Sequence, residues 1–229
     1  MSHPDTNNGP VNPLPASVIV LVAAMAAAEA VFTLGARGLV GGPEAIGWRS
    51  LAIQDYGFSN RAFAWMLENG IFRLDYAVRL FTYPFVHATF THMLFAAVLT
   101  LALGKFVGER LSQLAVLVLF FASAALGALT YALILPQGGG LIGAFPGVYG
   151  LIGGFTYLVW LRLGQMGEQQ IRAFSLIGIL LALQLVFGLF FGTGTTWIAD
   201  VAGFCAGFLL SFVLVPGGWR RLRSKIRHR

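Results

Sequence analysis

Long apolar runs alternate along the chain with short polar segments. A helix that crosses a bilayer core needs about 20 mostly apolar residues. Six stretches have this length and composition, and they predict six spans: Pro15–Ala36, Thr82–Gly104, Leu111–Leu135, Gly143–Leu163, Ile171–Phe191 and Thr196–Pro216. The pattern therefore predicts an all-α, polytopic membrane protein with a six-helix membrane domain over residues 15–216.

The segment between the first two predicted spans, about residues 38–81, has a different composition. It mixes charges of both signs with Trp, Tyr and Phe. A structureless loop of this length is uncommon, and such amphipathic segments are typical of short helices in the membrane interface. We therefore expect a long interfacial loop that contains short helices. We expect residues 1–14 to be a disordered cytoplasmic N-terminus and residues 217–229 a basic cytoplasmic tail.

Composition supports the membrane class, because 57% of the 229 residues are hydrophobic and only 10% are charged. The net charge of +6 is concentrated in the tail "RRLRSKIRHR". An anionic membrane surface is a better partner for this tail than nucleic acid, because the tail directly follows an apolar helix. The residues expected to anchor it to lipid are Trp219, Arg220, Arg221 and Arg223. A plain orientation signal is the simpler alternative.

Lys and Arg in the short loops predict the orientation. Lys105, Arg110, Arg162 and Arg172 fall on the same side as the basic tail, whereas the loops "PQGGG" and "FGTG" carry no charge. Cytoplasmic loops are enriched in basic residues. We therefore predict that both termini are cytoplasmic, in a bacterial inner membrane.

Two predicted spans carry small residues at helical spacing. The helix-packing residues we expect are Gly143, Gly147, Gly150, Ala199, Gly203 and Gly207. Small residues allow close backbone approach in lipid, where dispersion drives association. The pattern predicts that the fourth and sixth helices cross closely, although each could also pack elsewhere.

Three polar residues are expected to be buried: Glu29, His87 and Asp200. An acid within a span normally faces the bundle interior and finds a partner, and burial can also leave it protonated. His87 and His92 open the second predicted span. Five residues apart on one helix, they would project about 140° from each other. We therefore expect neither a metal site nor a cofactor.

Three stretches carry a resemblance to a known family. "RLFTYPFVHATFTHMLF" (79–95), "GAFPGVYGLIGG" (143–154) and "ADVAGFCAGF" (199–208) resemble the rhomboid intramembrane serine proteases. The resemblance implies a serine–histidine dyad on the fourth and sixth helices. It also implies a histidine and an asparagine on the second helix that help to bind the oxyanion.

The chemical positions of that family are altered in this sequence. The nucleophile position is Phe145, the base position is Asp200 and the asparagine position is Ala96, whereas His92 and Tyr149 are retained. Nucleophilic catalysis needs a hydroxyl or thiol beside a base, and phenylalanine supplies neither. We therefore interpret Phe145 as filling the hollow of the nucleophile.

These substitutions predict a pseudoprotease that binds transmembrane helices of partner proteins as a scaffold, chaperone or complex subunit. The alternative is an active intramembrane serine endopeptidase. The partner surface would lie between the second and fifth helices, at Phe90, Leu94, Phe187 and Phe191. Convergence of His92, Tyr149, Thr196 and Asp200 would form either a proton-handling site or a polar contact that holds the helices together. Membrane lipids are the other expected partners.

Overall fold

The computed structural model describes residues 13–191 and 194–215. Its helices are α1 (Ala16–Ala36), α2 (Trp48–Tyr56), α3 (Asn60–Asn69), α4 (Leu74–Thr82), α5 (Phe90–Arg110), α6 (Gln113–Ile134), α7 (Phe145–Gln165), α8 (Ser175–Phe191) and α9 (Trp197–Leu214). Short 3-10 helices are η1 (Pro43–Gly47), η2 (Tyr83–Phe85) and η3 (Gln170–Phe174). Each of the six predicted spans corresponds to one long helix, namely α1 or one of α5–α9.

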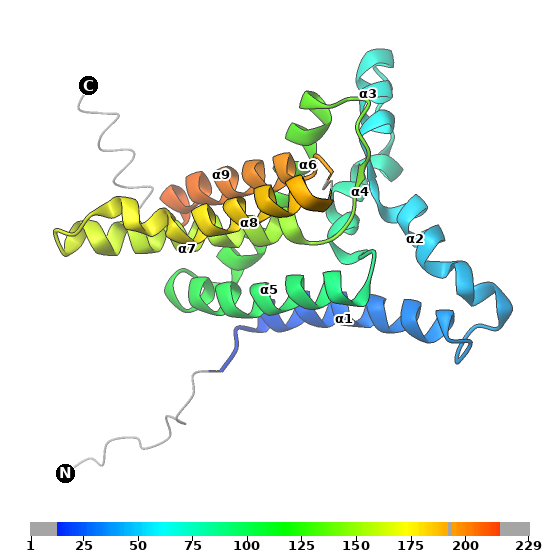
Figure 1. Cartoon of the computed structure of the whole chain (residues 1–229), viewed down its shortest axis with the longest axis horizontal. Helices are drawn as coiled ribbons and strands as arrows, with labels where there is room; N and C mark the ends of the chain where they lie inside the picture. The colour runs from blue at the N-terminus through cyan, green and yellow to red at the C-terminus, as the bar shows by residue number, and fades with distance from the viewer. Residues whose placement is uncertain (1–12, 192–193, 216–229) are drawn as a thin grey trace, which may run out of the picture.

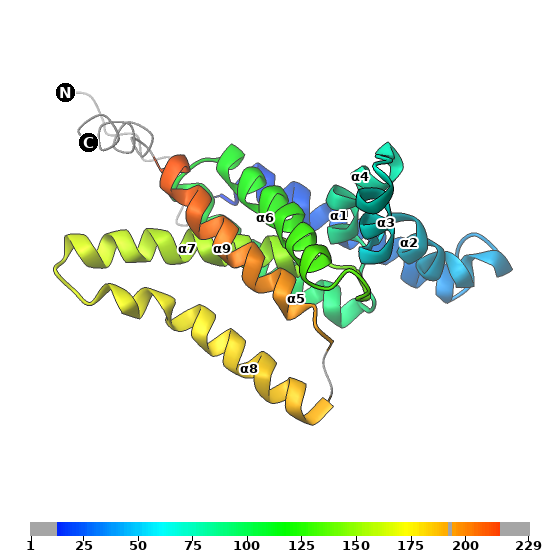
Figure 2. The same cartoon turned by 90° about the horizontal axis from the view of Figure 1, so that it is seen from above.

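The long helices and the short ones form separate parts of the molecule. Helices α2, α3 and α4 group at one end, whereas α1, α5, α7, α8 and α9 run along its long axis (Figures 1 and 2). Four of the described helices are long and apolar enough to cross a membrane: α1, α5, α6 and α9. Of the other two, α7 has 21 residues and is rich in glycine, and α8 has 17.

The chain between α1 and α5 contains short helices, as the sequence predicted, and one small sheet that it did not. Strand β1 (Phe58–Ser59) pairs antiparallel with β2 (Gly140–Leu141). This pairing ties the α2–α4 group to the loop that precedes α7. The backbone N–H of Gly143 also donates to the Tyr83 carbonyl at 2.9 Å. These contacts fix the start of α7.

The predicted start of the second span was wrong by eight residues. Thr82 ends α4, and α5 begins only at Phe90. The intervening η2 contains Pro84, which lacks a backbone donor. Thr89 then caps α5, because its hydroxyl accepts from the His92 backbone N–H at 3.1 Å. His87 therefore lies before the helix and not on it.

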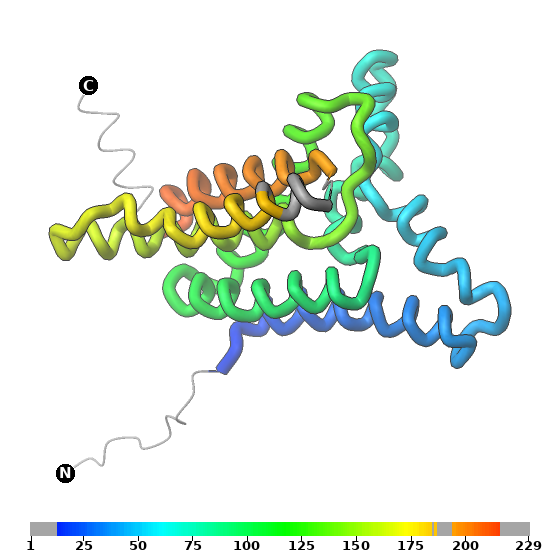
Figure 3. Tube along the Cα trace, in the orientation of Figure 1, coloured from blue at the N-terminus to red at the C-terminus, as the bar shows by residue number. Residues whose placement is uncertain are grey.

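Helices α7 and α9 both run along the long axis of the molecule (Figure 3), and their backbones pack in direct contact. Gly203 lies against the Pro146 backbone and Gly207 against the Gly150 backbone. On another face of α7, a Cβ at Gly147 would lie 2.9 Å from the Phe120 carbonyl of α6. Helix α7 is thus enclosed by its neighbours, and the small side chains allow the backbone contact that holds helices together in lipid.

Candidate functional site

The first turn of α7 lies against the start of α5. Phe145 is the first residue of α7, and its ring stacks on the His92 imidazole with 5.2 Å between ring centroids and 13° between planes. Pro146 occupies the first turn, where its missing N–H costs no helical hydrogen bond. One turn after His92, Ala96 is fully buried and has no polar side-chain atom. The start of α7 therefore meets α5 through an aromatic ring, and Ala96 adds only a methyl group.

Gly143 shapes the same region from the preceding loop. Its φ of +88° lies in the left-handed region that favours glycine. A Cβ at this position would lie 2.5 Å from two atoms of the His92 imidazole. Gly143 thus allows His92 to approach the loop while the ring of Phe145 stacks on it.

His87 joins this cluster from outside the helix. Its ring centroid lies 5.1 Å from that of His92, with 84° between the rings. The expected separation of about 140° on one helix was wrong, because His87 precedes α5. Its side chain is fully buried, and neither ring nitrogen has a hydrogen-bond partner of good geometry among the described residues. Burial lowers the pKa of His87 to about 4, so the imidazole is neutral at pH 7.

A buried ion pair lies beside the histidines. Glu29 of α1 is 3% exposed and accepts from both terminal nitrogens of Arg49, at 2.8 and 2.7 Å. Arg49 also donates to the His87 carbonyl at 2.7 Å. Its hydrogen bonds to Glu29 raise the pKa of Arg49. This contact favours an ionised Glu29 over the protonated alternative, and it connects α1, α2 and the segment before α5.

Asp200 has a partner that the sequence did not indicate. It lies in the first turn of α9, is 6% exposed and accepts from the Gln184 amide nitrogen at 3.0 Å. Tyr149 is also buried, but Thr196 is exposed. In the described ranges, no hydrogen bond or ion pair joins His92 to Asp200. The structure thus connects Asp200 to α8, whereas His92 stacks on α7.

In the part of the chain that the structure describes, no histidine ring is hydrogen-bonded to a serine or threonine hydroxyl or to a cysteine thiol. Cys205 is exposed and free, and among the described residues no hydrogen bond joins a His87 or His92 ring to a serine, threonine or cysteine side chain. The same part contains no group of three His, Cys, Asp or Glu residues that could hold a metal ion. Trp219, Arg220, Arg221 and Arg223, and the side chains of Phe187 and Phe191, lie outside the described residues.

Comparison with protein families decides the assignment. The model of the rhomboid domain matches residues 75–217, from α4 to the end of α9. The chain belongs to the rhomboid family. This rhomboid is accordingly a multi-pass integral membrane protein.

Two relatives of this rhomboid carry protease names. "Putative rhomboid protease YdcA" from Bacillus subtilis (strain 168) is 28% identical over 143 residues, which cover 62% of this chain and 70% of the relative. "Rhomboid-like protease 3" from Toxoplasma gondii is 31% identical over 132 residues, which cover 58% of this chain and 49% of the relative. The match thus spans about half the length of the second relative.

Proposed function

We propose that this rhomboid does not hydrolyse peptide bonds and instead binds transmembrane helices of other membrane proteins. Its role is that of a scaffold, chaperone or complex subunit, with membrane lipids as its other partners. The observation that carries the proposal is the stacking of Phe145 on His92, at the position that the family resemblance assigns to the nucleophile. A phenyl ring cannot form an acyl-enzyme.

The other substitutions act in the same direction. The resemblance assigns the general base to the position of Asp200, whose carboxylate oxygen accepts from Gln184. It assigns an oxyanion donor to the position of Ala96, whose methyl group donates no hydrogen bond. Removing one such donor from an oxyanion hole costs about 3–4 kcal/mol of transition-state stabilisation. The nucleophile, the base and one donor are therefore replaced together.

The packing of the helices supports a retained binding function. The close crossing of α7 and α9 does not depend on catalytic side chains, because it is formed by Gly203, Gly207 and the backbone of α7. On α5, Phe90 and Leu94 are 55% and 44% exposed. These apolar side chains are available to lipid or to another helix.

An active intramembrane endopeptidase is the alternative, and the protease names of the two relatives favour it. A cleavage assay distinguishes the two functions. The purified full chain is reconstituted in liposomes with a labelled single-span reporter, and cleavage is followed on gels. A rhomboid with serine and histidine at the two positions is the matched control. We expect cleavage by the control only, and a product formed by this chain would overturn the proposal.

A helix-binding scaffold and a fixed subunit differ in how they retain their partners. Affinity purification from mild detergent, followed by quantitative mass spectrometry, measures this difference. One partner at constant stoichiometry supports the subunit role. Several single-span proteins at substoichiometric levels support a scaffold or chaperone. The predicted topology, with both termini cytoplasmic in a bacterial inner membrane, determines on which side tags should be placed.

A further inference from the structure

Two carboxylates are buried in the apolar helices, and their surroundings differ. Glu29 is 3% exposed and is paired with the guanidinium of Arg49. Asp200 is 6% exposed, yet its hydrogen-bond donor is the neutral amide of Gln184. None of the ion pairs between described residues includes Asp200. A carboxylate held in a membrane helix without a positive partner is costly, and such residues mark functional sites.

The pair formed by Asp200 and Gln184 has more acceptors than donors. Gln184 donates through Nε2 to Oδ2 of Asp200 at 3.0 Å. Its own Oε1 is buried and accepts no hydrogen bond from a described residue. The pair can therefore accept further hydrogen bonds. A lysine ammonium offers three donors and an arginine guanidinium offers five, and each also supplies the missing positive charge.

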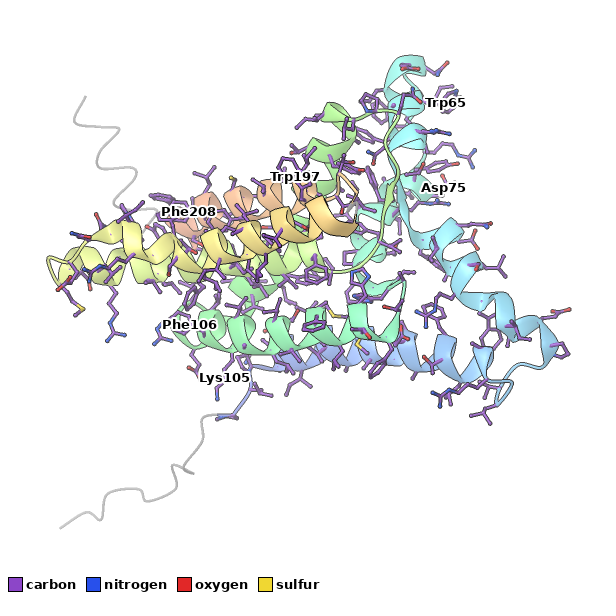
Figure 4. All side chains as sticks on the ribbon, in the orientation of Figure 1. Trp65, Asp75, Lys105, Phe106, Trp197 and Phe208 are labelled. Carbon is purple, nitrogen blue, oxygen red and sulfur yellow. The ribbon has the colours of Figure 1, made fainter. Side chains whose placement is uncertain are left out.

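The surroundings of the pair suit a hydrophobic helix that carries such a cation. Ile179, Leu183 and Val186 lie along one face of α8 and are 60%, 49% and 48% exposed, and this face is rotated about 100–160° around the helix from Gln184. Trp197 lies at the start of α9 (Figure 4), and its side chain is 49% exposed. Helix α8 diverges from α7 toward its C-terminal end (Figure 2). The two helices that hold the pair thus both carry exposed apolar side chains, which a hydrophobic partner helix can contact.

We propose that Asp200 and Gln184 form a binding site for a lysine or arginine side chain on a transmembrane helix of a partner protein. In the chain alone, the Gln184 amide satisfies one oxygen of the carboxylate. A bound cation adds charge neutralisation in a medium of low dielectric, where such pairing is strong. The inference rests on the proposed helix-binding function and specifies which helices are selected.

Binding of synthetic helices to the wild-type chain tests the inference without relying on a variant that may fold poorly. The probes are 21-residue Leu/Ala peptides with one Lys, one Leu or one Glu at the fourth position from one end, matching the place of Asp200 in α9. Binding to the full chain in liposomes is measured by energy transfer from an N-terminal donor dye. We expect a dissociation constant at least about tenfold lower for the Lys peptide than for the Leu peptide.

Variants then assign the preference to the carboxylate. Asp200→Asn should abolish the preference for the Lys peptide, and Asp200→Glu should keep it. The matched control is Asp75→Asn, because Asp75 is an exposed acid of α4 that pairs with Arg73. This control should leave the preference unchanged.

Each outcome has a separate meaning. Equal affinity of the wild-type chain for the Lys and Leu peptides would overturn the inference and leave the helix-binding function intact. Preference for the Glu peptide would also overturn it. That result would mean that Asp200 is protonated and donates a hydrogen bond to the glutamate, instead of binding a cation. Absence of binding to every peptide would overturn both the inference and the proposed function. An undiminished Lys preference in Asp200→Asn would show that another group selects the cation.

Discussion

The ring of Phe145 lies nearly parallel to the imidazole of His92, with 5.2 Å between their centroids and 13° between their planes. Aromatic rings at this separation attract each other beyond the effect of burial alone. Phe145 thus packs against one of the residues retained at the family's chemical positions. His92 therefore has a packing role against Phe145, although no nucleophile lies beside it.

Single reversions should not restore proteolysis. Phe145→Ser supplies a hydroxyl, but Asp200 and Ala96 still leave the base and one oxyanion donor missing, and catalytic groups of this kind act as a unit. We expect no cleavage of a single-span reporter by this variant. The combined variant Phe145→Ser, Pro146→Gly, Ala96→Asn and Asp200→His should cleave at least about tenfold above protein-free liposomes. Equal activity of the single and combined variants would contradict this account.

Gly207→Ala should destabilise the helix bundle strongly. A Cβ at Gly207 would overlap the Gly150 backbone, which cannot move aside as a flexible side chain could. Overpacking of this kind costs about 1–3 kcal/mol or more. Unfolding in mixed detergent micelles, followed by circular dichroism, measures the loss. Gly178→Ala in α8 is the control, because a Cβ there meets nothing within 4 Å. If both variants unfold alike, the crossing does not determine stability.

Periodicity and small-residue spacing predicted much of this architecture from sequence. They placed all six long helices, and the glycines of α7 and α9 indicated the close crossing that the structure contains. Both signals are local to one helix. They could be recognised because the thickness of the bilayer sets the length of a span, and because close packing of spans in lipid requires small side chains.

The site was less predictable, because its decisive contacts join distant segments. Arg49 reaches Glu29 across 20 residues, and Gln184 reaches Asp200 across 16, with no motif to indicate either pair. The geometry of His87 was wrong for a different reason. The start of α5 depends on the cap at Thr89 and on Pro84. The apolar run continues across both residues, so apolar composition alone did not indicate where the helix begins. The Thr89 hydroxyl before an apolar run is the signal that could have placed the start correctly.

Breaking the Glu29–Arg49 pair should destabilise the fold. Removing one partner leaves the other charge without compensation, at a cost of about 3 kcal/mol, the lower end for buried pairs because the Arg49 side chain is 24% exposed. Arg49→Ala and Glu29→Gln should each lower the unfolding midpoint in detergent, and the double variant should lose less than their sum. Arg73→Ala, at an exposed pair, should change little. Additive losses would show that the pair is not coupled.

His87 should make stability depend on acid pH. Its pKa is about 4 when folded and 6.5 ordinarily, so the unfolded chain binds a proton first as the pH falls. The contribution of His87 to the free energy of unfolding is fully present above pH 6.5, decreases as the pH falls from 6.5 to about 4, and does not change further below pH 4. The total decrease is up to about 3 kcal/mol. His92, Glu29 and Arg49 face the same region. Thermal unfolding of His87→Gln should therefore decline less over this range, whereas parallel decline would refute the assignment.

The most direct measurement is covalent labelling of the wild-type chain by a fluorophosphonate probe in liposomes, read by intact-protein mass spectrometry. Such probes react with serines activated by a neighbouring base. The account predicts no adduct under conditions that label a rhomboid with the serine and histidine in place. A stoichiometric adduct on any serine, lost in His92→Ala, would contradict it.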